Sequence, residues 1–253
     1  MSSAHFTAET SADGVVERDF TVAGVPGALW SPAASSGRAP LVLMGHGGGN
    51  HKKSPAVRGR ARLLVADGGF HVACLDAPGH GDRPRTDHDE REIGVMQRAM
   101  ADGDPVGPVV VRYNAHLAER AVPEWRAALD ALQELPEIGP GGPVGYFGLN
   151  MGTAIGVPLV AADPRITAAV FGLFWGDSLA ETAQRVTVPV EFTLQWNDQH
   201  IPRASGLALF DAFASKEKTL HANAGSHKEL PRFEAASAVR FFVRHLGGAA
   251  PRT

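Results

Sequence analysis

Three residues at the ends of apolar segments could together catalyse the transfer of an acyl group. Asn150 sits at the centre of the glycine-flanked turn Gly148-Leu149-Asn150-Met151-Gly152, between an apolar segment and a run of small residues. Asp198 and His227 lie in polar loops that each follow an apolar segment farther along the chain. An aspartate that orients a histidine allows the imidazole to take a proton from a nucleophile or a water molecule. The order along the chain is turn residue, acid, histidine.

Two further loops follow expected strands and are rich in glycine, and the first of them could bind a developing negative charge. The first is His46-Gly47-Gly48-Gly49, and the second is Asp76-Ala77-Pro78-Gly79-His80-Gly81. Glycine-rich loops expose backbone N–H groups, which can stabilise an oxyanion as it forms. No Lys-Ser/Thr pair follows the glycines at the spacing of a phosphate-binding loop. Because the carboxyl ends of parallel strands meet at one sheet edge, we expect all these loops to lie close together.

The elements that must position these loops alternate between strands and helices. Strands are expected at residues 16–23, 26–31, 41–44, 70–75, 144–149, 167–173, 189–195 and 217–222. Helices are expected at residues 57–67, 87–101, 111–134, 151–162, 177–185, 203–214 and 232–246. This alternation predicts an α/β fold with a mostly parallel sheet of about eight strands and helices on both faces.

The chain is expected to form one domain with a short tail and one insertion. Residues 1–14 are small and polar, which predicts a flexible N-terminal tail. Residues 15–253 show no internal repeat and no low-complexity linker, so a single domain is expected there. Within it, residues 82–108 are highly charged and interrupted by proline and glycine. We expect this segment to leave the sheet and cover part of the site as a small lid.

The bulk composition excludes several classes of function. A chain of 253 residues that is 44% hydrophobic can bury one substantial core. Its net charge of −3 gives no electrostatic basis for binding nucleic acid or an anionic membrane. The single cysteine, Cys74, lies in an apolar run and is expected to be a buried, inert thiol in a reducing compartment. With no signal peptide and no apolar stretch of about 20 residues, a cytoplasmic protein is expected.

Together these segments resemble an α/β-hydrolase of the dienelactone-hydrolase-like serine esterase group. The similarity extends over nearly the whole chain from about residue 15 and rests on the two glycine-rich loops, the turn around Asn150, Asp198 with Pro202, and Gly225 before His227. The resemblance implies the α/β-hydrolase fold and hydrolysis of a small-molecule carboxylic ester, with lactones and thioesters as further substrate classes. It also implies that the reaction needs neither a metal nor an organic cofactor.

The resemblance assigns a role to each candidate site residue. Asn150 marks the nucleophile position, Asp198 is the orienting acid and His227 is the base. Asp177, which follows the preceding strand, is the alternative acid. The remaining candidates are two backbone N–H donors for the oxyanion hole and two side chains for an acyl pocket: Gly48 and Met151, and Trp175 and Trp196.

Asn150 departs from the family pattern, which places serine or cysteine at the turn. Asparagine tolerates positive φ better than most residues, so we expect the turn and the pocket to survive the change. A carboxamide is a poor nucleophile because its nitrogen lone pair is delocalised. Loss of a triad nucleophile removes a factor on the order of 10⁶ from kcat.

Three hypotheses follow from the asparagine. The chain is an inactivated form of a serine esterase, or it is a non-covalent enzyme in which His227 and Asp198 act as a general base, or it is a ligand-binding protein without catalysis. The retention of the other catalytic parts argues against a pure binding role. We favour the first hypothesis because no compensating nucleophile lies near the turn in the sequence.

Overall fold

Short apolar segments form the strands of one mixed sheet in the computed structural model, which describes residues 3–34 and 37–247. In sheet order, the nine strands of the described residues are β1-β2-β3-β5-β4-β6-β7-β8-β9. The first three and β5 pair antiparallel, and the strands from β5 to β9 pair parallel. Their bounds are β1 His5–Ala12, β2 Val15–Val22, β3 Val25–Pro32, β4 Leu41–Met44, β5 His71–Leu75, β6 Val144–Phe147, β7 Ile166–Gly172, β8 Val190–Gln195 and β9 Lys218–Asn223.

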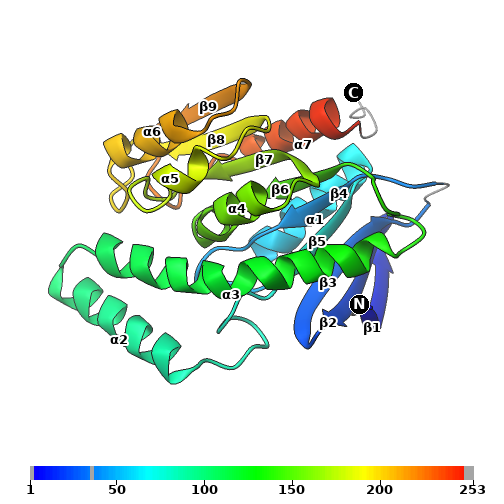
Figure 1. Cartoon of the computed structure of the whole chain (residues 1–253), viewed down its shortest axis with the longest axis horizontal. Helices are drawn as coiled ribbons and strands as arrows, with labels where there is room; N and C mark the ends of the chain where they lie inside the picture. The colour runs from blue at the N-terminus through cyan, green and yellow to red at the C-terminus, as the bar shows by residue number, and fades with distance from the viewer. Residues whose placement is uncertain (1–2, 35–36, 248–253) are drawn as a thin grey trace.

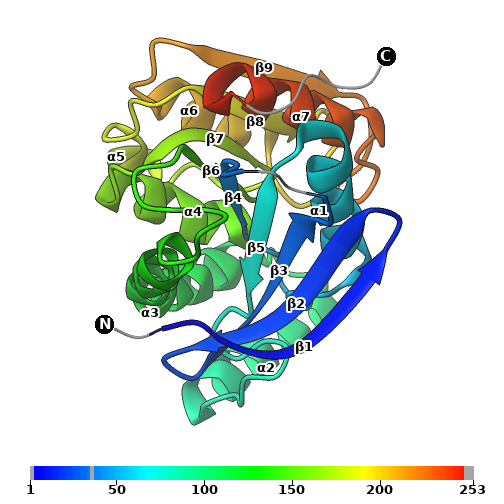
Figure 2. The ribbon, with the colours of Figure 1, turned by 90° about the vertical axis from the view of Figure 1, so that its right-hand side faces the viewer.

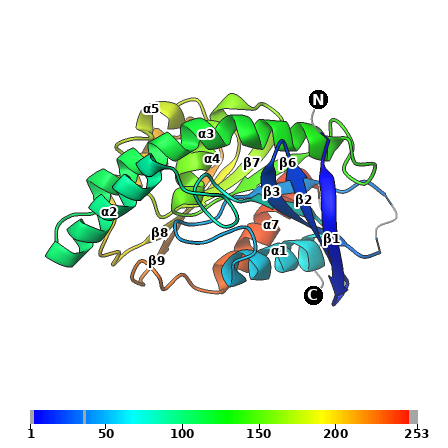
Figure 3. The ribbon, with the colours of Figure 1, turned by 90° about the horizontal axis from the view of Figure 1, so that it is seen from below.

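Helices cover both faces of the sheet, as Figures 1 and 3 show. One face carries α3 (Gly107–Gln133), α4 (Met151–Ala162), α5 (Ala180–Ala183) and α6 (Arg203–Ala212), and the other carries α1 (Pro55–Gly68) and α7 (Phe233–Leu246). The predicted α/β-hydrolase fold class is therefore confirmed, with one strand more than expected. No helix among the described residues combines the length and apolarity that a membrane span requires.

The central parallel strands are buried along their whole length because helices pack on both of their faces. In β4, Leu41 and Leu43 join the apolar cluster beneath α3 and α4, whereas Val42 and Met44 join the cluster beneath α1 and α7. The two-residue period of a strand sends alternate side chains into two separate cores. The carboxyl ends of these strands are thereby held at one rigid edge.

The N-terminal tail predicted for residues 1–14 is wrong over most of its length. Residues 5–12 form β1, which pairs antiparallel with β2 through a two-residue turn at Asp13 and Gly14, both at positive φ. The segment looks like a tail in sequence because β1 is an edge strand whose side chains are almost all exposed. Figure 2 shows β1 and β9 at opposite ends of the sheet. Residues 1, 2 and 248–253 lie outside the described part of the chain.

The insertion at residues 82–108 contains the helix expected near 87–101, which is α2 (Asp87–Asp102). A capping box between Thr86 and Asp89 begins the helix, and Gly103 at φ 74° ends it. Asp89 is the buried residue of α2, so the helix contributes little to the core. Figure 1 shows α2 beside α3 and outside the main body of the sheet. A lid function for this helix stays a prediction.

Glycines bring α4 unusually close to β6 and to the loop after β4. A Cβ atom built on Gly156 would overlap the ring of Tyr146, and one built on Gly148 would overlap the Gly152 carbonyl. The Tyr146 hydroxyl donates to the Gly152 carbonyl at 2.7 Å, which locks the first turn of α4 to the strand. Only residues without a side chain allow this approach.

We expect Gly156→Ala to lower the free energy of unfolding by about 1–3 kcal/mol, because the new methyl group must displace the buried Tyr146 ring. Urea denaturation measures the change. The matched control is Gly59→Ala on the exposed side of α1, where a Cβ meets no atom within 4 Å. That change should stabilise the protein by about 0.5–1 kcal/mol, because alanine favours a helix over glycine. Equal effects of the two substitutions would contradict the close-packing account.

Candidate active site

Asn150 occupies a strained turn between β6 and α4. Its φ of 56° confirms the positive value expected from the sequence, and its ψ is −123°. These angles do not match the left-handed helical region that asparagine tolerates. They match the first central position of a type II′ turn, which favours glycine. A non-glycine residue there costs on the order of 1–3 kcal/mol, so the surrounding structure must hold the turn in place.

Backbone and hydroxyl contacts hold this turn against β7. The Asn150 N–H donates to the Gly172 carbonyl at 3.1 Å. The Thr153 hydroxyl, which is fully buried, lies 2.6 Å from the same carbonyl and accepts from the Gly172 N–H at 2.9 Å. It also lies 2.8 Å from the Gly148 carbonyl. The sequence analysis missed Thr153, because a threonine in the first turn of a helix has many ordinary uses.

Asp198 and His227 meet across the loops that follow β8 and β9. The Asp198 Oδ2 and His227 Nδ1 atoms are 2.6 Å apart. The other carboxylate oxygen of Asp198 accepts from the backbone N–H groups of His200 and Ile201 at 2.8 and 3.0 Å. The alternative acid, Asp177, is exposed and does not supply this contact. An ionised Asp198 fixes the proton on Nδ1, which leaves Nε2 with the lone pair that a general base needs.

A hydrogen bond from the Gln195 side chain holds the loop that carries His227. The Gln195 side chain, only 1% exposed, donates to the Ser226 carbonyl at 2.9 Å. A Cβ on Gly225 would come within 2.9 Å of that amide, so the glycine allows the loop to approach. The His227 N–H donates to the Gln199 side chain at 3.1 Å. The sequence analysis missed Gln195, since a glutamine that ends a strand normally points to solvent.

The loop after β4 runs directly beside the strained turn. A Cβ built on Gly47 would lie 3.8 Å from the Cβ and Nδ2 atoms of Asn150, whereas one on Gly48 would meet nothing within 4 Å. The Gly47 carbonyl accepts from the Asn50 N–H at 3.1 Å and from His46. Because the peptide is planar and trans, the Gly48 N–H points away from those two donors. Gly48 therefore borders open space next to the turn.

His46 fixes this loop as a neutral side chain. Its Nε2 accepts from the Ala77 N–H at 3.0 Å, so the ring proton lies on Nδ1 and is donated to the Gly47 carbonyl at 2.9 Å. Burial lowers the pKa of His46 from 6.5 to about 4. The imidazole thus joins the loops after β4 and β5 without carrying charge near neutral pH. It cannot serve as a base for substrate while both nitrogens are occupied.

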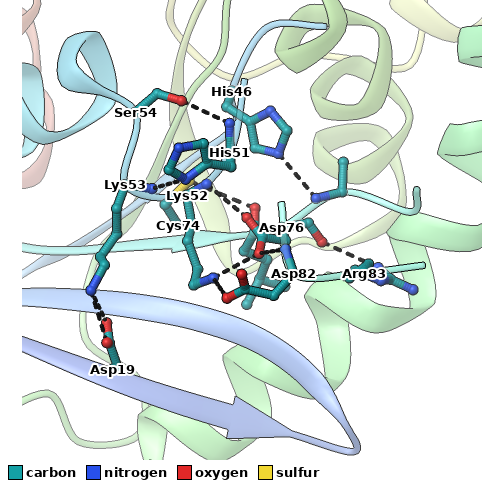
Figure 4. A network of polar contacts seen from close by, with 12 residues as sticks. Asp19, His46, His51, Lys52, Lys53, Ser54, Cys74, Asp76, Asp82 and Arg83 are labelled. Atoms are coloured by element: carbon teal, nitrogen blue, oxygen red, sulfur yellow. Dashed lines mark hydrogen bonds and ion pairs between the residues drawn. The ribbon is translucent and has the colours of Figure 1, made fainter. Parts of the chain in front are cut away.

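A buried ion pair also joins the same two loops, as Figure 4 shows. The Lys52 Nζ atom lies 2.7 Å from Asp76 and 2.6 Å from Asp82. Asp76 additionally accepts from the Lys52 and Asp82 backbone N–H groups at 2.8 and 3.0 Å. Burial alone would raise the pKa of the Asp76 carboxyl, but Lys52 and these donors lower it below its ordinary value. The sequence analysis missed Lys52, because a lysine in a loop is normally solvated.

The two backbone donors expected for an oxyanion hole flank Asn150. Met151 follows Asn150 directly, and its N–H opens α4, where the first turn lacks intrahelical acceptors. Gly48 lies on the neighbouring loop, beside Gly47. The roles of Gly48 and Met151 stay predictions.

The two tryptophans expected in a substrate pocket differ in their surroundings. Trp175 is half-buried, stacks edge-on against Phe174 and lies beside Gly107 at the start of α3. Trp196 is 42% exposed, and the Arg203 guanidinium covers its ring at 3.8 Å from the centroid. Trp175 therefore lies at the junction of the body and the insertion. Contact with a substrate stays a prediction for both residues.

Removing the buried ammonium of Lys52 should lower the free energy of unfolding far more than removing that of Lys53, which is more exposed. We expect Lys52→Met to lower the free energy of unfolding by about 3–5 kcal/mol, because Asp76 would remain as a buried, unpaired charge. Lys53→Met is the matched control and should cost about 0–1 kcal/mol, because its nearer partner Asp19 is 29% exposed at the side chain and its second partner, the buried Glu17, keeps its ion pair with Arg58 at 2.9 Å. Urea denaturation measures both changes. A small loss of unfolding free energy in Lys52→Met would contradict the inference that the buried ion pair stabilises the protein.

The depressed pKa of His46 predicts a pH dependence of stability. Between pH 6.5 and about 4 the unfolded chain protonates this histidine while the folded chain does not, so acidification favours unfolding. When the pH is lowered from 7 to 5, His46 should account for a loss of about 2 kcal/mol in the free energy of unfolding. We expect the drop in unfolding free energy to be smaller by this amount in His46→Gln. Identical drops in the two proteins would show that His46 is not buried as a neutral ring.

Known structures share this arrangement of elements, although no family model and no curated protein matches the sequence. A structure described as the PEG-bound complex of a novel cold-adapted esterase from an Arctic intertidal metagenomic library is 35% identical, with a TM-score of 0.72 over 94% of this chain and 97% of that one. An acetyl xylan esterase from Paenibacillus sp. R4 is 14% identical, with a TM-score of 0.68 over 97% and 89%. A dienelactone hydrolase from Anabaena variabilis is 22% identical, with a TM-score of 0.62 over 96% and 99%.

The last two structures share the fold with this chain, and the esterase from the Arctic library shares both the fold and extensive sequence. The nine-stranded sheet with helices on both faces and the match at 35% identity over almost the full length of both chains agree with each other. The chain belongs to the α/β-hydrolase superfamily and has the scaffold of its ester hydrolases.

Proposed function

We propose that this chain is a serine-type carboxylic ester hydrolase whose nucleophile position is occupied by Asn150 and whose hydrolytic activity is therefore strongly impaired. The observation that carries the proposal is the hydrogen bond of 2.6 Å between Asp198 and His227, formed at the same sheet edge as the strained turn. An oriented imidazole and a turn that exposes one side chain are the parts that acyl transfer to serine requires.

In the proposed reaction, a hydroxyl at position 150 would attack the ester carbonyl. His227 Nε2 would take the hydroxyl proton and give it to the leaving alcohol as the ester C–O bond breaks, while Asp198 stabilises the imidazolium that forms. His227 would then take a proton from water, which attacks the acyl-enzyme, and return that proton to the hydroxyl at position 150 as the carboxylic acid leaves. The N–H groups of Gly48 and Met151 would stabilise the oxyanion. The Asn150 carboxamide cannot perform the attack, so only binding and oxyanion stabilisation would remain in this chain.

The substrate class follows from the relatives and from the surroundings of the site. The similar structures include an esterase and, at fold level, an acetyl xylan esterase and a dienelactone hydrolase, which favours a small-molecule ester. Three arginines in or near the insertion already pair with carboxylates, which favours a neutral substrate over an anionic one: Arg83 with Glu124, Arg85 with Glu90 and Arg112 with Glu92. We propose an uncharged or weakly polar acyl group, bordered by Trp175 and Trp196 and covered by α2.

A second candidate is a general-base enzyme that forms no acyl intermediate. It is favoured by one observation: the Asp198–His227 pair is complete without any contribution from position 150. In such an enzyme His227 would activate water, and the Asn150 carboxamide would donate a hydrogen bond to the substrate. A purely ligand-binding role would use the same edge of the sheet but neither proton-transfer group.

Asn150→Ser should restore hydrolysis. We expect kcat on a panel of short and medium chromogenic acyl esters to rise by about 10⁴–10⁶, because the missing nucleophile is supplied to an intact acid–base pair. Stopped-flow absorbance should show a burst of one equivalent if an acyl-enzyme accumulates. Asn150→Ala is the matched control, since it changes the same position without adding a hydroxyl.

The outcomes separate the candidates. Activity in the serine variant that is lost on adding His227→Ala supports the serine-esterase proposal. Activity of the unmodified chain that His227→Ala abolishes supports the general-base alternative instead. If the serine and alanine variants are equally inactive on every ester of the panel, the esterase proposal fails and a binding role is favoured.

A further inference from the structure

A second group of ionisable side chains lies away from the proposed active site, between α7 and the outer strands. Glu191 begins β8, His221 lies in β9 and Glu234 lies in the first turn of α7. The two glutamates are only 4% and 6% exposed. Asp198 and His227 are instead in loops beyond the carboxyl ends of these strands, so the two groups are separate. Two carboxylates in such an environment require compensating positive charge.

The contacts of His221 determine which of its two ring nitrogens carries the proton. Its Nδ1 atom lies 2.7 Å from Glu234 Oε2, and Asn223 donates to the other oxygen of that carboxylate at 2.8 Å. An ionised carboxylate only accepts hydrogen bonds, so Nδ1 carries the proton. In the neutral imidazole, Nε2 then presents its lone pair.

The Nε2 lone pair faces the oxygen of another carboxylate. His221 Nε2 is 3.7 Å from Glu191 Oε2, which is too long for a hydrogen bond. The same oxygen accepts from the Ser237 hydroxyl at 3.0 Å, so Ser237 fixes its position. Two acceptors that face each other in a largely buried site are unfavourable unless a positive centre lies between them. This pairing of acceptors points to a cation.

We propose that Glu191 and His221 bind a divalent transition-metal cation of the zinc type, with Glu234 orienting the imidazole from its far side. The donor atoms of the three residues all lie within 4.8 Å of one another. Metal–ligand distances of about 2.0–2.2 Å place tetrahedral ligand atoms about 3.4 Å apart. The distance of 3.7 Å between His221 Nε2 and Glu191 Oε2 is close to that value. A histidine that binds a metal through one nitrogen commonly donates its other N–H to a carboxylate, as His221 does to Glu234.

A cavity reaches this group from the side of Glu191 and Ser237, whereas neither His221 nor Glu234 lines it. It has a volume of about 180 Å³ and is lined by Glu191, Ser237 and Thr219, among others. Water from the cavity would complete the coordination, and a mixed imidazole and carboxylate set favours zinc over magnesium. Arg240 and Arg244 also line the cavity. Their charges oppose a cation, so we expect affinity in the micromolar rather than the nanomolar range.

A proton is the competing occupant of this site. Burial raises the pKa of Glu191, which would allow the carboxyl to be protonated and neutral. At 3.7 Å, neither a protonated Glu191 nor the Nε2–H of a His221 imidazolium would form a good hydrogen bond between these two atoms without a rearrangement. The two occupants differ in one measurable respect, because only the metal site binds zinc with a defined stoichiometry.

Isothermal titration calorimetry of the chelator-treated protein with zinc chloride at pH 7 tests the proposal. We expect one equivalent to bind to the unmodified chain. His221→Ala should lose this binding, and Glu191→Gln, which preserves the side-chain shape, should weaken it at least about tenfold. Glu234→Gln should weaken it by about 10–100-fold, as expected for an outer carboxylate. Circular dichroism establishes that each variant is folded, and Glu191→Gln provides the test if His221→Ala is not.

His116→Ala is the matched control, because His116 and His88 form a separate histidine pair with ring centroids 4.3 Å apart. Zinc binding should be unchanged in that variant. The absence of zinc binding to the unmodified chain would overturn the proposal in favour of a proton. Binding that survives Glu191→Gln and His221→Ala but is lost in His116→Ala would assign zinc to surface histidines and would equally overturn it.

Discussion

The buried carboxylate of Asp76 joins the loops after β4 and β5, and the first of these loops runs beside Asn150. A buried charge is tolerated only when its acceptor sites are filled. Here the Lys52 ammonium and two backbone N–H groups fill them, and these donors come from both loops. His46 adds a neutral link between the same loops through Ala77 and the Gly47 carbonyl. The orientation of the Gly48 peptide, and thus the proposed oxyanion hole, depends on this combination of one ion pair and one imidazole.

The other half of the site is built independently. Asp198 and His227 are held by backbone N–H groups and by Gln195 from the end of β8. None of these contacts involves position 150, so a change at the turn leaves the acid–base pair in place. Meanwhile Asn150 keeps the strained φ of 56° and ψ of −123°. The strained turn therefore supports the proposal that position 150 is a nucleophile site, although the asparagine there cannot act as a nucleophile.

The fold class and the contact between Asp198 and His227 were predictable from the sequence because short patterns mark the strands and the loops that follow them. Glycines around Asn150, apolar segments that end in polar loops, and the order of Asp198 and His227 each follow from short stretches of chain. The turn itself was only half predicted: its positive φ was expected, but its ψ lies outside the region that asparagine favours. The ψ value depends on contacts from β7 through Thr153 and Gly172, which the sequence around position 150 does not reveal.

What the sequence could not predict depends on long-range partners. The polar edge strand β1 resembles a tail until it pairs with β2. Lys52 resembles a solvated loop lysine until Asp76, 24 residues away, buries it. The same holds for Glu191, His221 and Glu234, which come from three elements and have no recognisable spacing. A residue is informative by itself only when the local sequence marks its position, as the loops after apolar segments do for Asp198 and His227, which are 29 residues apart.

The central claim is that the scaffold retains a site able to activate a nucleophile at position 150. The most direct test is to treat the Asn150→Ser variant with a fluorophosphonate and to weigh the intact protein by mass spectrometry, since this reaction requires no knowledge of the substrate. The account predicts one covalent adduct on residue 150 in that variant, greatly slowed by His227→Ala, and no adduct in the unmodified chain. An unreactive serine at position 150 in a folded protein would contradict it.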